Sequence, residues 1–282
     1  MEFHYNKSVE GLSMKKSLFT AVVVLLLVAF GVSAYMVGNY LIEGKQQADR
    51  YGELSNIAAN AQTETTDASE ETQSNAAETE ETAETTEPTE PGMLAGYKEI
   101  YEMNNDVVGW IKMEGTKMDY PVMQTPDDPN FYLYRDFDKN NSKRGSIYAR
   151  EVCDINEPSD NITIFGHNMA DGSMFACLSN YTNKHAWENN SLIFFDTLNE
   201  YHTYKIFAVF KTSANIGQGF SYHQFVDAEN AAQFDEFVAT CKKLSFYDTG
   251  ITPVYGDKLI CLSTCEYTLD NGRLVVAAVR IT

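Results

Sequence analysis

The pattern of apolar and polar positions divides the chain into three parts. From Leu18 to Val37 the residues are apolar and uncharged, and twenty residues of helix span about 30 Å, the thickness of a membrane's hydrocarbon core. Residues 61–92 contain no aliphatic side chain larger than Ala, so this segment cannot bury enough surface to offset its chain entropy. From Met93 onward, apolar residues recur with the periods of strands and helices.

The third part predicts many short strands. Alternating or continuous apolar runs bounded by turn formers predict strands at 107–113, 118–123, 145–149, 161–165, 192–195, 204–211, 259–266 and from 273. Leu94, Tyr97 and Ile100 are spaced as one face of a helix that precedes them. The number of strands and their lengths predict a mainly β fold with helices, in which the strands form a closed or nearly closed barrel.

Two further helices are expected between the strands. Ser173 is predicted to cap a short helix, and Asp227 is predicted to cap a longer one that ends before the strand at 259. The inner stripe expected for the longer helix consists of Phe234, Phe237, Val238, Cys241 and Leu244.

The apolar segment near the N-terminus predicts a membrane anchor. Lys15 and Lys16 precede it, which places residues 1–17 in the cytoplasm, the anchor at 18–37 and the remainder outside the cell. A cleaved signal peptide ending near Ala34 is the competing interpretation, although the apolar region is long for that role. Residues 42–60 are compatible with a short polar continuation of the helix, within a predicted disordered linker at 38–92. Residues 93–282 are the predicted folded domain.

Charge is concentrated in the predicted linker. The formal net charge is −19, and the stretch from Tyr51 to Tyr97 contains eleven acidic residues with no Lys or Arg. A linker of this composition is extended by its own charge and holds a domain away from the membrane. The chain has no large basic patch, so nucleic acid is excluded as an expected partner.

The cysteines and histidines argue against a metal or disulfide framework. The five cysteines are an odd number without CxxC spacing, and no two histidines have HxxxH spacing. We therefore predict neither a metal site nor a cofactor.

A possible reactive pair lies near the C-terminus. The apolar run that begins at Leu259 ends at Cys265, and Arg273 opens the next strand after a turn containing Asp270, Asn271 and Gly272. If the two strands are antiparallel neighbours, the thiol lies beside a permanent cation, a setting that lowers a thiol pKa and suits a nucleophile. A buried Cys near a surface Arg is an equally good interpretation of these two residues taken alone.

A histidine completes the candidate chemistry. His167 follows Gly166 at the end of the buried strand 161–165, a position suited to acid–base work. A thiolate that attacks a carbonyl, a histidine that transfers a proton and an arginine that stabilises the oxyanion together make a site for acyl transfer. No Asp or Asn could be assigned from the sequence as the group that orients His167.

These residues resemble a known family. Leu262-Ser263-Thr264-Cys265 with Arg273 eight residues later, and Phe165-Gly166-His167-Asn168-Met169, look like the motifs of a sortase. The resemblance is closer to class B sortases, as indicated by Asp106-Val107-Val108-Gly109-Trp110-Ile111, Thr116-Lys117-Met118-Asp119-Tyr120-Pro121-Val122 and Gly166-His167-Asn168-Met169-Ala170-Asp171-Gly172-Ser173-Met174-Phe175. It extends over residues 94–282.

The resemblance implies a fold and a mechanism. It implies an eight-stranded sortase barrel with an N-terminal helix and a helix before the strand that carries Cys265. It implies that Cys265 is the nucleophile, His167 the acid–base residue and Arg273 the oxyanion or substrate-orienting residue, with Ser263, Glu266 and Tyr222 lining the substrate groove.

The resemblance also implies partners. Such an enzyme cleaves a C-terminal sorting motif of a secreted protein after its Thr, holds the acyl part as a thioester and transfers it to an amine of a peptidoglycan precursor or a pilin. Two alternatives stay open: a cysteine protease that mainly hydrolyses, and a non-catalytic barrel that binds a surface polymer or peptide.

Overall fold

The computed structural model describes residues 3–71, 92–215 and 217–282, and it contains two compact units. The boundary falls within the long helix α1 (Phe3–Glu71), between Asp49 and Arg50. In the first unit, the helix includes an uncharged stretch beginning at Leu18 that is long and apolar enough to cross a membrane, judged by its length and composition. Its large apolar side chains, among them Leu25 and Phe30, are exposed.

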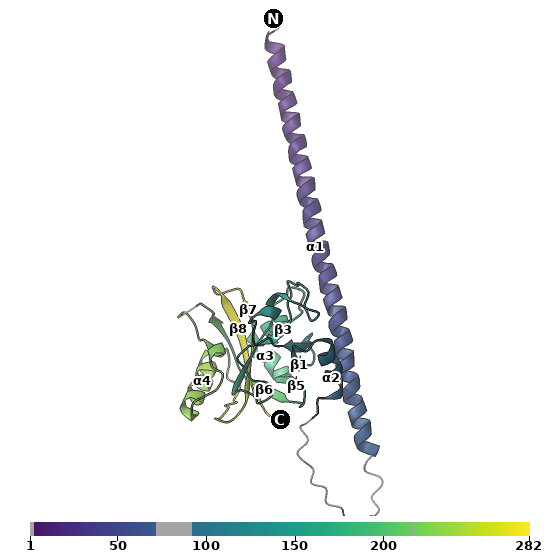
Figure 1. Ribbon diagram of the computed structural model, residues 1–282. Helices are drawn as coiled ribbons and strands as arrows, with labels where there is room; N and C mark the ends of the chain where they lie inside the picture. Colours follow the sequence, from purple (N-terminus) through teal and green to yellow (C-terminus); the bar gives the residue numbers. More distant parts are fainter. Residues whose placement is uncertain (1–2, 72–91, 216) are drawn as a thin grey trace, which may run out of the picture. The chain divides into compact units, whose positions relative to one another are not determined.

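The second unit, from Arg50 to Thr282, is built on a closed eight-stranded barrel (Figure 1). The strand order around it is β1-β2-β3-β4-β7-β8-β6-β5. The strands are β1 (Val107–Lys112), β2 (Asp119–Met123), β3 (Ile147–Ala149), β4 (Asn161–Phe165), β5 (Leu192–Thr197), β6 (Thr203–Ser213), β7 (Leu259–Glu266) and β8 (Gly272–Arg280). The predicted mainly β barrel is confirmed.

Two of the eight strand pairs are parallel, β2 with β3 and β4 with β7, while the others are antiparallel. The parallel pairs require long connections, which carry the remaining helical segments. These are η1 (Phe131–Tyr134), η2 (Phe175–Thr182), α3 (Lys184–Asn189), η3 (Tyr222–Gln224) and α4 (Ala231–Leu244), in addition to α2 (Ala95–Met103) before β1.

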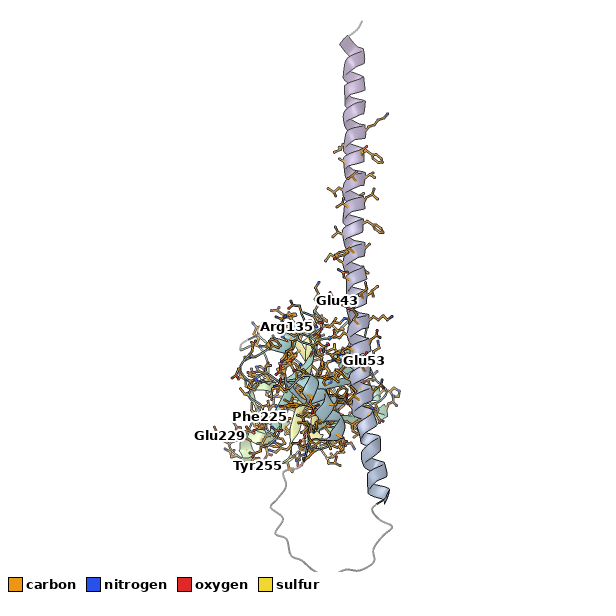
Figure 2. All side chains as sticks on the ribbon, turned by 45° about the vertical axis from the view of Figure 1, so that its right-hand side comes forward. Glu43, Glu53, Arg135, Phe225, Glu229 and Tyr255 are labelled. Carbon is orange, nitrogen blue, oxygen red and sulfur yellow. The ribbon has the colours of Figure 1, made fainter. Side chains whose placement is uncertain are left out.

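Two apolar clusters hold this unit together. The larger cluster fills the barrel and includes residues of α1 and α2, such as Leu54 and Ile100. The smaller cluster lies between α4 and the outer face of β6, β7 and β8. There, Phe225 stacks on Phe237 with ring centroids 4.1 Å apart, and Tyr255 contacts Phe234. Figure 2 labels Phe225 and Tyr255. Burying both faces of β7 explains why the strand is apolar on both faces.

The prediction of a disordered linker at 38–92 is corrected for residues 38–71, which the structure describes. Helix α1 continues through Glu71, and residues Tyr51, Leu54 and Ala58 are buried at 5%, 0% and 6% exposure. Their spacing of three and four residues forms an apolar stripe, which packs on the barrel together with a hydrogen bond from Ser55 Oγ to Asp119 of 2.7 Å. The folded unit therefore begins at Arg50 rather than at Met93. Residues 72–91 lie outside the described residues.

Both predicted helix caps are wrong. Asn230 caps α4, since its side chain accepts a hydrogen bond from Gln233 N–H. Asp227 instead accepts from the backbone N–H of Asp160 at 2.9 Å. Leu244, predicted to face inward, is 40% exposed at the end of α4.

The short predicted helix is the 3₁₀ segment η2. It begins at Phe175 and has no side-chain cap. The Ser173 hydroxyl donates to Asp171 and accepts from Arg144 Nη1 at 3.0 Å.

Candidate active site

Strand register brings the three predicted catalytic residues together at one end of the barrel. Cys265 on β7 is the direct partner of Arg273 on β8. On the other side of β7, Phe165 of β4 pairs with Ser263 in parallel. Beyond this pair the regular ladder stops, but Thr264 Oγ1 donates to the carbonyl of Gly166 and Asn168 Nδ2 donates to the carbonyl of Cys265. His167 therefore belongs to a segment that runs beside Cys265. Cys265 thus lies between Arg273 on β8 and the segment after β4 that carries His167, and these three residues make up a row on neighbouring segments.

Gly166 sets the orientation of His167. A Cβ at Gly166 would lie 2.5 Å from Cδ1 of Ile147 and 2.7 Å from Cγ of Phe175. Both neighbours are core residues, so only Gly fits at this inward-facing position. Because side chains alternate between the two faces, the next residue, His167, faces outward and is half-buried.

A backbone carbonyl orients the imidazole. His167 Nε2 lies 2.8 Å from the carbonyl oxygen of Leu133 in η1, and since that oxygen can only accept, Nε2 carries the proton. Nδ1 is then the ring nitrogen available for proton exchange. The Tyr134 ring packs on the imidazole with centroids 5.8 Å apart. The sequence did not reveal this orienting group, because every residue has a carbonyl and only the fold selects one.

Cys265 is the one cysteine of the five that is not buried. The other four are buried, whereas Cys265 is partly exposed. Burial raises the pKa of Cys153, Cys241 and Cys261 and raises that of Cys177 to about 11. Because the thiolate is the nucleophile, these four thiols are inert, and the accessible thiol is the one beside Arg273.

Arg273 is held by its own turn. Its Nη1 donates to the carbonyl of Gly272 at 2.9 Å and to Oδ1 of Asn271 at 3.1 Å. Burial raises the pKa of Tyr148 and of Tyr222, and the nearby positive charge of Arg273 offsets part of that rise. Tyr148 and Tyr222 therefore lie near Arg273.

The other three predicted site residues lie beside this row, but their polar atoms are already bonded. The hydroxyls of Ser263 and Tyr222 are 2.5 Å apart, and both residues are buried. Glu266 accepts from Lys211 Nζ at 2.7 Å and from the backbone N–H of Thr268. Burial opposes ionisation of Glu266, yet these bonds hold its pKa at about 2. Their predicted part in substrate binding stays a prediction.

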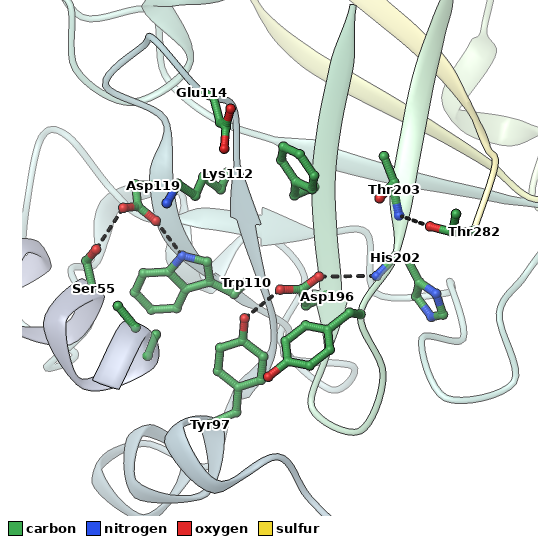
Figure 3. Close-up of a pocket in the computed structure, with 14 residues that line it drawn as sticks. Ser55, Tyr97, Trp110, Lys112, Glu114, Asp119, Asp196, His202, Thr203 and Thr282 are labelled. Carbon is green, nitrogen blue, oxygen red and sulfur yellow. Dashed lines mark hydrogen bonds between the residues drawn. The ribbon is translucent and has the colours of Figure 1, made fainter. Parts of the chain in front are cut away.

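A pocket of about 360 Å³ lies at the far end of the barrel (Figure 3). Its lining includes His202 and Thr203 at the start of β6, and strand β6 pairs with Arg273 only at Thr212, about 30 Å further along at 3.3 Å per residue. Two of its three side-chain carboxylates are paired within the chain: Asp196 accepts from Tyr97 Oη at 2.7 Å, and Asp119 accepts from Trp110 Nε1 at 2.7 Å. This pocket is the seam where α1 and α2 meet the barrel.

Metal ligation is not supported in the part of the chain that the structure describes. No group of three His, Cys, Asp or Glu side chains among the described residues could hold a metal ion. At the Cys265 end, the thiol, the imidazole and the guanidinium can supply nucleophilic attack, proton transfer and stabilisation of negative charge.

Comparison with known proteins agrees with this geometry. The model of the sortase domain family matches residues 111–281. Sortase B of Staphylococcus aureus (strain NCTC 8325 / PS 47) is 30% identical over 186 residues, which cover 64% of this chain and 73% of that protein. Sortase B of Listeria monocytogenes serovar 1/2a (strain ATCC BAA-679 / EGD-e) is 29% identical over 188 residues, which cover 66% and 74%.

A solved Staphylococcus aureus sortase B–substrate complex superposes with a TM-score of 0.62 at 28% identity, covering 67% of this chain and 86% of that one. Sortases are cell-surface cysteine transpeptidases that act on sorting-motif substrates and transfer them to an amine acceptor. The matched domain covers strands β2 to β8 and the end of β1, and sortase B proteins are among the relatives, so the chain belongs to the sortase family, as a class B cysteine transpeptidase.

Proposed function

We propose that this protein is a membrane-anchored transpeptidase in which Cys265, His167 and Arg273 carry the reaction. The observation that supports the proposal is that Cys265 pairs with Arg273 on one side and that the segment carrying His167 is bonded to Cys265 on the other. The substrate is a secreted protein with a C-terminal sorting motif that is cleaved after its Thr. The acceptor is an amine of a peptidoglycan precursor or a pilin.

The first half-reaction forms a thioester. The Cys265 thiolate attacks the carbonyl carbon of the scissile peptide bond, and the Arg273 guanidinium stabilises the negative charge that develops on the oxygen. The carbon–nitrogen bond then breaks as protonated His167 gives its proton to the leaving amine. Nδ1 makes this transfer, because Nε2 is bonded to Leu133.

The second half-reaction releases the product. The acceptor amine attacks the thioester carbon, neutral His167 takes the proton of that amine, and the carbon–sulfur bond breaks to restore the thiolate. Transfer to water instead of the amine gives hydrolysis, so the enzyme must favour amine attack. A hydrolysing cysteine protease is the second candidate function, and it uses the same three side chains.

One experiment tests the chemistry directly. Incubation of the purified domain with a library of sorting-motif peptides, followed by mass spectrometry, should show a thioester adduct on Cys265. The Cys265→Ala variant should show no adduct and no product, while Cys177→Ala should behave as wild type, because Cys177 is buried. Full transpeptidation by Cys265→Ala would overturn the proposal.

Two further measurements separate the alternatives. Adding an amine nucleophile to the peptide assay should divert the acyl group into an amide, whereas a protease would continue to give the free acid. A non-catalytic binding barrel would form neither product. Alkylation at neutral pH should modify Cys265 in the folded protein, since its thiol is partly exposed.

The proposed topology has residues 1–17 in the cytoplasm, the anchor at 18–37 and the catalytic domain outside. It is supported by the apolar stretch of α1 from Leu18 and by Lys15 and Lys16 before it. Anchoring in the membrane that also holds the substrates raises their effective concentration at the enzyme. Protease added to intact cells should digest residues 93–282, and the mature protein should retain residues 18–37. Loss of those residues would indicate a cleaved signal peptide.

A further inference from the structure

The side chain of Asn168 connects the histidine segment to the cysteine strand. Its Nδ2 donates to the backbone carbonyl of Cys265 at 3.1 Å and to Oγ of Ser179 at 3.4 Å. The first partner can only accept, so the amide nitrogen must face it. With both hydrogens of the amide directed at acceptors, the orientation of the Asn168 side chain is defined by its surroundings rather than by its own rotamer preference.

A second bond lies on the other side of His167. Thr264 Oγ1 donates to the carbonyl of Gly166 at 2.7 Å. The residues before and after His167 are therefore tied to two consecutive residues of β7, Thr264 and Cys265. The carbonyl of His167 itself accepts from Phe175 N–H at 2.9 Å. The backbone of His167 is thus held on three sides.

These bonds begin where the sheet ends. The regular pairing of β4 with β7 stops at Phe165 and Ser263, and His167 and Cys265 lie just beyond it. Backbone ladders alone do not set the spacing between the two reacting side chains there. Proton transfer requires heavy atoms at about 2.6–3.2 Å, and a displacement of 1 Å costs about 10²-fold in rate. A side chain that spans this gap therefore has a kinetic consequence.

We propose that Asn168 is a positioning residue for acyl transfer, whose amide holds the Cys265 carbonyl and so keeps the His167 imidazole within reach of the thiol. This inference rests on the proposed function. Asn168 does not act on the substrate, because its amide is already directed at Cys265 and Ser179. Its influence should therefore appear in kcat rather than in KM.

The test uses two variants with different chemistry. Asn168→Ala removes the donor and should lower kcat by about 10- to 100-fold, with KM changed less than about threefold. Asn168→Asp has the same shape, but its carboxylate accepts only and faces another acceptor. Protonation restores a donor, so its kcat relative to wild type should recover as the pH falls toward about 4. Asn168→Ala should show no such recovery.

Asn180→Asp is the matched control. Asn180 is exposed and adjacent to Ser179, so this variant adds the same charge nearby without removing the bond to Cys265, and it should keep wild-type kcat at every pH. The midpoint of thermal unfolding of each variant, measured at the assay pH, must be higher than the assay temperature. Loss of kcat in Asn168→Ala that disappears when only folded protein is counted would assign Asn168 a purely structural role and overturn the inference.

The two proposals fail separately. Wild-type kcat in Asn168→Ala together with an inactive Cys265→Ala would overturn the inference about Asn168 and leave the proposed function standing. Full activity in Cys265→Ala would overturn the proposed function itself. An Asn168→Asp variant that is inactive at neutral pH and does not recover with acid would show that charge or shape, rather than the lost donor, is responsible, and this result also overturns the inference.

Discussion

The two ends of the barrel both contain a histidine with polar partners, yet they are built for different tasks. At the far end, Asp196 and His202 are buried at 8% and 7% exposure, and Tyr97 donates to Asp196. At the other end, His167 and Cys265 are partly exposed. One end uses its polar groups to bind α1 and α2 to the barrel, whereas the other leaves its thiol accessible.

The pKa shifts of the far end follow from its burial. Burial raises the pKa of Asp196 and lowers that of His202, and the charge of Arg280 lowers the latter further. Buried groups with perturbed pKa values in a pocket are often taken as a sign of catalysis. Here Asp196 belongs to a seam in which it is bonded to Tyr97 within the chain, so the comparison shows that a shifted pKa can mark a structural contact instead of a reactive group.

Substitution of the two histidines, His167 and His202, is expected to give the largest difference between the two ends of the barrel. His167→Ala should lower kcat by about 10²- to 10⁴-fold, because it removes the proton-transfer group, and should leave the free energy of unfolding nearly unchanged. His202→Gln should change the free energy of unfolding and leave kcat at the wild-type value. Steady-state assays of both variants with a sorting-motif peptide check this, and equal kcat values for the two would contradict the assignment of the catalytic end.

A large loss is also expected for Arg273→Ala. Removing the guanidinium beside Cys265 should cost at least about 10²-fold in kcat/KM, since the oxyanion loses its stabilising charge. Arg280→Ala, at the opposite end of the same strand β8, is the control and should retain activity. The measurement is kcat/KM for both variants, and retention of full activity by Arg273→Ala would exclude an electrostatic role.

The seam should respond to Leu54→Ala in stability. Leu54 is fully buried on α1, so its truncation should cost about 2–5 kcal/mol in the free energy of unfolding. Asn56→Ala, on the exposed face of the same helix, is the control and should not lower it, because Ala is the better helix former. Urea unfolding of residues 50–282 measures both, with kcat at low temperature expected to be unchanged. A wild-type midpoint for Leu54→Ala would show that the helix does not contribute to the folded unit.

The smallest predicted effect is a pH dependence of stability. Because the folded-state pKa of His202 is lowered, the unfolded chain takes up a proton near pH 6.5 while the folded protein does not. The stability that neutral His202 contributes is therefore present above pH 6.5 and is lost as the pH falls toward the lower folded-state pKa. Melting temperatures between about pH 7.5 and 5 should fall less steeply in His202→Gln than in wild type; identical slopes would contradict this origin.

Local patterns were sufficient for most of the fold. The alternation of apolar residues located the strands of the barrel, and the short turn between Glu266 and Gly272 made the pairing of Cys265 with Arg273 predictable, because hairpin neighbours are close in sequence. Caps were less predictable. Asp227 and Asn230 are both good capping residues. In the structure, Asp227 accepts a hydrogen bond from the backbone N–H of Asp160, and Asn230 caps the helix.

The sequence by itself determined the strand pattern, the apolar segment near the N-terminus and the three residue types of the reactive row. Only the tertiary structure decided that Leu133 supplies the carbonyl for His167, that the segment 50–59 docks on the barrel and that Asn168 reaches Cys265. The physical reason is the range of the interactions. Side-chain periodicity and turn chemistry act over a few residues, whereas the hydrogen bonds of His167 and Asn168 join groups that are 34 and 97 residues apart and exist only once the barrel has closed.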